Sequence, residues 1–202
     1  MHARRRATSQ PKPGSIADPT AAAADPVEAA RSLCLRQLTL GPRSRAQLTD
    51  LLAKRGIPGD AAERVLSRFA EVGLIDDAAY AASWVESRHR SRGLARRAIA
   101  QELRSKGIAE PESSAALETL DRHQEEATAR LLVERKLRGT QGLEPVARVR
   151  RLSGMLARKG YPPGLALLVV RAALADERAV RDNDERNAFD EALQHASRDL
   201  DG

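Results

Sequence analysis

Three stretches of this chain share one pattern, and that repeat limits the folds open to it more than any other feature. In each stretch a glycine follows a predicted helix, at Gly56, Gly107 and Gly160, so the spacings are 51 and 53 residues. A basic residue stands directly before each glycine, and an apolar residue directly after it. Aliphatic residues stand eight and four positions before the glycines, as Leu48 and Leu52, Ile99 and Leu103, and Leu152 and Leu156. Such spacing, ended by glycine, is typical of one face of a short amphipathic helix.

A repeating unit of about 50 residues buries little core alone, whereas stacked neighbours bury a continuous one. We therefore predict an all-α fold, an elongated array of three tandem three-helix repeats. Arg-, Pro- and Ser-rich composition predicts disorder for the segment before the first repeat. The polar, acidic composition of the tail after the third repeat predicts either a frayed continuation of the last helix or disorder. The predicted units are a disordered N-terminal extension (1–25), three repeats (26–75, 76–120 and 121–176) and the acidic C-terminal tail (177–202).

The middle repeat shows how the elements are expected to follow one another. Asp76 is a good N-cap for a helix over 77–85, on which Tyr80 and Trp84 share a face and are interpreted as packing residues. A basic corner over 88–93 is expected next. One short basic helix over 93–108 would follow, with Ala95, Ile99 and Leu103 on its apolar face.

Positive charge is concentrated in two blocks of a chain whose formal net charge is +6. Residues 88–106 hold seven basic and one acidic residue, and residues 130–159 hold nine basic and two acidic residues, whereas 107–129 and 176–202 are acidic. A helix C-terminus favours a cation, which accounts for the basic residue before each glycine. It leaves an excess of arginines, which form either a solvated face or, as we favour, a contact with an anionic partner. The candidates are Arg88, Arg90, Arg92, Arg96, Arg97, Arg104, Arg135, Arg138, Arg148, Arg150 and Arg151.

Motifs for catalysis are missing from the sequence. No Gly-x-x-x-x-Gly-Lys loop occurs, so a P-loop is excluded. The four histidines, His2, His89, His123 and His195, lack the spacing of a zinc site. We therefore expect a protein that is not an enzyme and that uses no metal and no other cofactor.

The sequence lacks the features that are typical of membrane and secreted proteins. No run of about 18 apolar residues suggests a membrane span. Arg4, Arg5 and Arg6 are not followed by the apolar region of a secretory signal. Cys34 is the only cysteine, which excludes an internal disulfide. We expect a cytoplasmic protein, a monomer, with no membrane contact.

The residues 73–84, Gly-Leu-Ile-Asp-Asp-Ala-Ala-Tyr-Ala-Ala-Ser-Trp, with Arg92-Gly93 and the stretch Glu-Leu-Arg-Ser-Lys-Gly-Ile over 102–108, resemble the RecX regulatory proteins of bacteria. The resemblance covers roughly 28–176. It implies tandem three-helix repeats that bind the RecA recombinase and lodge in the groove of its filament on single-stranded DNA. It also implies inhibition of strand exchange, ATP hydrolysis and co-protease activity.

Two other classes of function stay open. The second helix of each repeat could act as a recognition helix, which would make the chain a direct nucleic-acid-binding helical repeat protein. Steep salt dependence on naked DNA, without RecA, would favour this alternative. A pure protein scaffold is the third possibility, and for a scaffold DNA would make no difference. The sequence does not decide whether the arginines contact RecA, DNA or both.

Overall fold

The computed structural model describes the backbone of residues 25–200 and the side chains of residues 25–191. Within this part the chain is helical, with one short 3-10 helix (Arg138–Thr140) and no strand. Of the predicted N-terminal extension, only Asp25 lies inside the described residues, where its side chain caps the first helix. The helices are α1 (Pro26–Leu40), α2 (Arg45–Lys54), α3 (Gly59–Glu71), α4 (Asp77–Arg92), α5 (Arg96–Ser105), α6 (Glu110–Glu118), α7 (Arg122–Leu137), α8 (Pro145–Arg158) and α9 (Pro163–Leu200).

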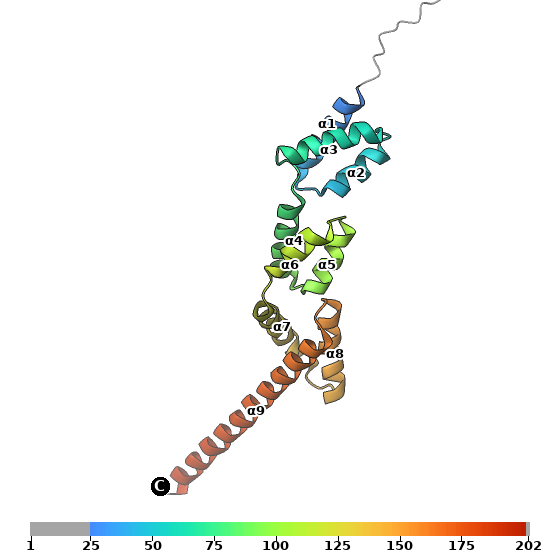
Figure 1. The fold of residues 1–202 in the computed structure, drawn as a ribbon. Coiled ribbons are helices and arrows are strands. Elements are labelled where there is room, and N and C mark those ends of the chain that lie inside the picture. Colours follow the sequence, from blue (N-terminus) through green and yellow to red (C-terminus); the bar gives the residue numbers. More distant parts are fainter. Residues whose placement is uncertain (1–24, 201–202) are drawn as a thin grey trace, which may run out of the picture.

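Three groups of three helices are stacked end to end into an elongated array (Figure 1). Helices α1–α3 enclose one hydrophobic core, α4–α6 a second and α7–α9 a third. The predicted all-α array of three three-helix repeats is therefore confirmed. None of the described helices, including the long α9, has the length and apolar character that a membrane span requires.

The aligned positions of the repeat occupy equivalent places in the structure. All six aliphatic residues that precede the glycines lie in the cores with at most 1% of their surface exposed. The glycines Gly56, Gly107 and Gly160 have φ angles of +72°, +72° and +88°, the left-handed conformation that ends each second helix. The basic residues before them are the C-caps of α2, α5 and α8, where the helix dipole favours a positive charge.

Two predicted helix boundaries in the middle repeat were wrong. The expected basic corner over 88–93 is instead the last turn of α4, because no helix breaker occurs before Gly93, which ends α4 with φ +59°. Helix α5 begins only at Arg96, so Ala95 is its N-cap and not a member of its apolar stripe. Ala95 is nevertheless fully buried, in the core of the third repeat.

The acidic tail takes the helical alternative. Helix α9 does not end after the third core but continues through the tail to Leu200 and projects away from the array (Figure 1). The side chains of residues 178–191 are exposed along this projection.

Successive repeats are joined through their second helices, which lie head to tail. At the first junction the Ser44 hydroxyl, at the N-cap of α2, donates a hydrogen bond of 2.6 Å to the carbonyl of Lys106, the C-cap of α5. The Arg45 N–H donates to Asp77 Oδ1 of the following repeat at 2.9 Å. The two helix ends therefore satisfy each other, because Ser44 pairs with a carbonyl at the C-terminus of α5 and Asp77 pairs with an N–H at the N-terminus of α2.

The second junction repeats this arrangement with other residues. The Ala95 N–H donates to the carbonyl of Lys159, the C-cap of α8, at 2.9 Å, and the Arg96 N–H donates to Glu125 Oε1 at 2.8 Å. The Tyr161 hydroxyl adds a buried hydrogen bond of 3.1 Å to the Gly93 carbonyl. Helices α8, α5 and α2 thus form one continuous column, which we call the second-helix column.

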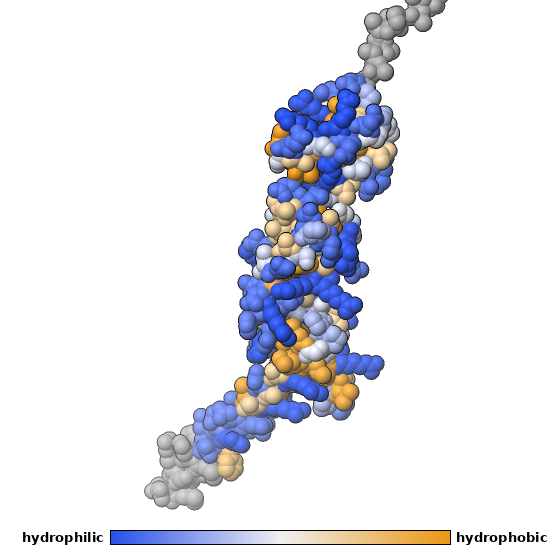
Figure 2. Space-filling view, viewed as in Figure 1, coloured by the Kyte–Doolittle hydropathy of each residue, from blue (hydrophilic) through white to orange (hydrophobic). Residues whose placement is uncertain are grey.

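The surface of the array is largely hydrophilic over the first two repeats (Figure 2). Apolar side chains gather on the third repeat in this view, where α8 and α9 lie. Its exposed large apolar residues include Leu143, Val146 and Leu168.

Candidate partner-binding interface

The structure divides the eleven candidate arginines by what their side chains contact. Three have partners inside the fold, two make ion pairs on exposed helix surface and six have no ion pair among the described side chains. Contact with RecA or DNA stays a prediction for all eleven. The partners of the first three nevertheless give them structural roles.

Arg88 belongs to a network around the only tryptophan. Its Nε donates to Glu102 Oε2 at 2.9 Å, and its guanidinium lies 3.8 Å from the centre of the Trp84 ring. Trp84 Nε1 donates to the same Glu102 oxygen at 2.8 Å, and the Tyr80 ring stacks on Trp84 at 5.7 Å. Tyr80 and Trp84 therefore pack within the second repeat, as predicted, and hold Arg88 against it.

Arg96 is part of the second junction. Besides its backbone contact, its guanidinium lies 3.6 Å from Glu125 Oε2 and donates to the carbonyl of Leu120. Glu125 is nearly buried and faces this side chain. Removing the positive charge would leave the Glu125 carboxylate without its nearest counterion, so Arg96 joins the repeats whatever else it contacts.

Arg148 closes the distal end of the third repeat. Its Nη2 lies 2.6 Å from Glu177 Oε2 on α9, its Nε donates to the Thr140 hydroxyl at 3.1 Å, and both ionic side chains are only 13% exposed. Hydrogen bonds from Gln141 and from Arg148 lower the pKa of Glu177. The Glu177 carboxylate therefore stays ionised at neutral pH, and its contacts fix α9 against Arg148 and against the loop before α8.

Arg90 and Arg92 are exposed but have acidic neighbours. Arg90 forms an ion pair with Glu86 one turn earlier on α4, and Arg92 lies 4.0 Å from Glu102. Exposed pairs of this kind contribute little to stability and exchange readily for another anion.

The remaining six arginines are exposed, and none forms an ion pair with a described side chain: Arg97, Arg104, Arg135, Arg138, Arg150 and Arg151. Four of the six lie on the second-helix column, two on α5 and two on α8. Arg97 and Arg104 are seven residues apart, which places them on one side of α5. Arg97 and Arg150 occupy equivalent positions, each ten residues before the glycine of its repeat, where the first repeat has Ala46. Successive repeats thus present unpaired guanidinium groups along one column, an arrangement that suits a long anionic surface.

Sequence reasoning missed the residues that pair with these arginines. Glu102 neutralises Arg88, and Glu125 lies against Arg96, although each is far away in the sequence. One signal was available for Glu102, because it is the only acidic residue in the basic block over 88–106. His89 was also missed as a contact between repeats, where its ring lies 2.9 Å from the Thr128 hydroxyl.

Among the described side chains, no group of three or more His, Cys, Asp and Glu residues is placed to hold a metal ion. Cys34 lies in the first core, where burial raises the pKa of its thiol.

Comparison with known proteins gives one consistent match. Family models described as the first, second and third three-helix domains of RecX match residues 30–69, 76–117 and 124–170. A regulatory protein RecX from Streptomyces lividans is 63% identical over 153 residues, which cover 76% of this chain and 81% of that protein. One from Thermobifida fusca is 55% identical over 158 residues, which cover 78% and 85%.

Solved structures of similar proteins have the same fold. A crystal structure of RecX from Lactobacillus salivarius superposes with a TM-score of 0.69 at 19% identity, covering 74% of this chain and 97% of that one. A second structure, described as regulatory protein RecX, superposes with a TM-score of 0.66 at 26% identity, covering 73% of each chain.

Proposed function

The chain belongs to the RecX family of regulatory proteins, and from this premise we propose that it binds the RecA recombinase in its filament on single-stranded DNA. Binding inhibits the strand exchange, ATP hydrolysis and co-protease activity of the filament, and so modulates DNA repair and the SOS response. The protein acts by occupying a surface and performs no chemistry of its own.

The observation that carries this proposal is the row of unpaired arginines on the second-helix column. A filament repeats the same surface at regular intervals, so an elongated ligand with charges in successive repeats can contact several subunits at once. Arg97, Arg104 and Arg150 supply such charges, and no described carboxylate neutralises them. Electrostatic attraction speeds the encounter, and the rigid array then blocks the groove sterically.

Charge reversal tests the proposal. Arg97→Glu, Arg104→Glu and Arg150→Glu together should abolish inhibition of RecA ATP hydrolysis on single-stranded DNA, measured at two salt concentrations. A matched control carries Arg36→Glu, Arg64→Glu and Arg171→Glu, which are exposed residues on α1, α3 and α9. Both variants change the net charge equally, so only the position of the charges differs. Full inhibition by the column variant, with its helicity intact, would exclude this surface.

Direct recognition of DNA by the second helices is less well supported. Recognition helices present their N-terminal residues to base edges. The N-termini of α2 and α5 are instead engaged by the following repeat, through Asp77 and Glu125. Titration of naked single-stranded DNA in the same salts separates the two functions, because only the direct binder would saturate without RecA.

A further inference from the structure

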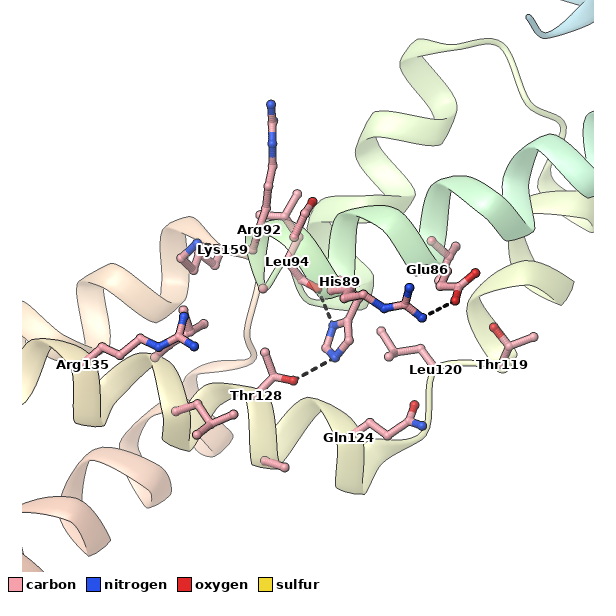
Figure 3. A pocket seen from close by; sticks show the side chains of 17 residues that line it. Glu86, His89, Arg92, Leu94, Thr119, Leu120, Gln124, Thr128, Arg135 and Lys159 are labelled. Atoms are coloured by element: carbon pink, nitrogen blue, oxygen red, sulfur yellow. Dashed lines mark hydrogen bonds and ion pairs between the residues drawn. The ribbon is translucent and has the colours of Figure 1, made fainter. Parts of the chain in front are cut away.

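A cleft of about 950 Å³ opens where the second and third repeats meet (Figure 3). One wall is a single face of α7, with Gln124, Thr128, Leu131 and Arg135 at spacings of three or four residues. These positions extend over about 16 Å of helix, at 1.5 Å per residue. The cleft is therefore long enough for about three turns of a second helix laid beside α7.

The opposite wall is the C-terminal half of α4, and His89 fixes the distance between the walls. Its Nδ1 lies 2.9 Å from the carbonyl of Leu94, and its Nε2 lies 2.9 Å from the Thr128 hydroxyl on α7 (Figure 3). Lys159 reaches the same junction and donates to the carbonyl of Arg92. The cleft is thus formed by residues that already hold two repeats together.

The lining of the cleft combines cationic and apolar side chains. The lining includes Arg90, Arg92, Arg135 and Lys159, whereas its one carboxylate is Glu86, which is paired with Arg90. Figure 3 places Arg135 and Lys159 at one end of the cleft and Glu86 at the other. The large apolar side chains of the lining include the leucines Leu94, Leu120, Leu131 and Leu132. Leu131 is 52% exposed, although it lies beside a cationic rim.

We propose that this cleft binds an acidic amphipathic helix of the protein partner, with apolar side chains on the leucines and carboxylates toward the cations. Helix-in-groove recognition requires such an apolar strip with charges at its edges. A nucleic acid strand fits less well, because none of the described residues that line the cleft is Phe, Tyr or Trp, on which bases would stack. Hydrated phosphates would also leave the leucines uncovered. The inference rests on the proposed function for the identity of the partner, RecA.

The test compares two double variants that carry the same substitutions at different positions on the surface. Leu131→Ser with Arg135→Glu changes the cleft, and Leu168→Ser with Arg171→Glu makes the same changes on an exposed part of α9. Because all four side chains are exposed, both variants should retain the helicity and thermal midpoint of the wild type. The probes are labelled RecA assembled as its filament on oligo(dT), labelled oligo(dT) without RecA, and a labelled twelve-residue helix of Glu and Leu, with a Lys and Leu version as its control.

We expect the cleft variant to lose at least about tenfold in affinity for RecA and for the acidic helix, with oligo(dT) affinity and the control variant unchanged. Unchanged RecA affinity in the cleft variant would refute the cleft as the binding site, although it would not contradict RecA binding elsewhere on the protein. Binding of the acidic helix but not of RecA by the wild type would retain the cleft and refute the proposed function. If the cleft variant loses as much affinity for oligo(dT) as for RecA, the cleft binds nucleic acid and the proposal is refuted. If the wild type binds the Lys and Leu helix as tightly as the Glu and Leu helix, charge plays no part in recognition.

Discussion

Replacing Gly107 by alanine should open the junction between the first two repeats. A Cβ built on Gly107 would lie 2.3 Å from the Cβ of Ala46, which belongs to the preceding second helix. Ordinary contacts between such atoms exceed 3.4 Å, so the two repeats must move apart. That movement also strains the hydrogen bond from Ser44 to the Lys106 carbonyl, which lies beside the glycine.

Gly56 provides a matched control for the loss in the free energy of unfolding that Gly107→Ala should cause. It ends α2 with the same φ of +72°, and a Cβ there would meet nothing within 4 Å. Gly56→Ala therefore reports only the left-handed backbone, about 1–2 kcal/mol for a residue with a Cβ. Gly107→Ala adds the forced overlap, for which overpacking typically costs a further ~1–3 kcal/mol. The difference between the two variants measures the junction itself.

Urea unfolding followed by fluorescence gives the comparison. Trp84 is the only tryptophan and lies in the second repeat, so its signal reports the unit that Gly107 joins to the first repeat. Circular dichroism at 222 nm follows the whole array. We expect a lower free energy of unfolding for Gly107→Ala than for Gly56→Ala by about 1–3 kcal/mol. Equal losses in the two variants would refute the close approach of the second helices.

Two further predictions concern the third repeat. Glu177 has a lowered pKa in the folded state, so its stabilising effect is present above the unfolded value of about 4.3 and disappears as pH falls through the folded value. Glu177→Gln should therefore lose less stability than the wild type between pH 7 and pH 3, in thermal midpoints measured across that range; parallel curves would contradict the ion pair with Arg148. Burial, helped by the nearby Glu125, raises the pKa of Tyr161, so its phenol stays protonated and donates to the Gly93 carbonyl. Tyr161→Phe should cost about 1–3 kcal/mol in urea unfolding, because that buried carbonyl loses its partner while the ring still fills the core.

The core of each repeat could be predicted because its signal is local. Ile99 and Leu103 lie one helical turn apart, and the same pair recurs at Leu48 and Leu52, so periodicity alone identified residues that are fully buried. The positions at which helices begin and end could be predicted less well. Ala95 fits the apolar period of α5 but lies outside it, since its N–H is taken by the Lys159 carbonyl of another repeat.

The residues that form the junctions and pair with the arginines could not be predicted from the sequence, because they do not recur at the same position in each repeat. Asp77 and Glu125 make the same contact with the preceding second helix, yet Asp77 stands 30 residues before its glycine and Glu125 stands 35 before its own. No column of the repeat contains both. Likewise, charge counting identified Arg88 and Arg97 as equally surplus. Only the fold shows that Arg88 is held by Glu102 while Arg97 is not paired with any described side chain.

The third repeat lacks the stacking contact that the first two repeats make through their second helices. In the first two repeats the first N–H of the second helix is taken by a carboxylate of the following repeat. Helix α8 starts with Pro145, which has no N–H to satisfy, so it needs no such neighbour. Its end is closed instead by Arg148 and Glu177, from within the same repeat. Contacts within the fold therefore account for Arg96 and Arg148, whereas Arg97 and Arg150 form no ion pair with any described side chain.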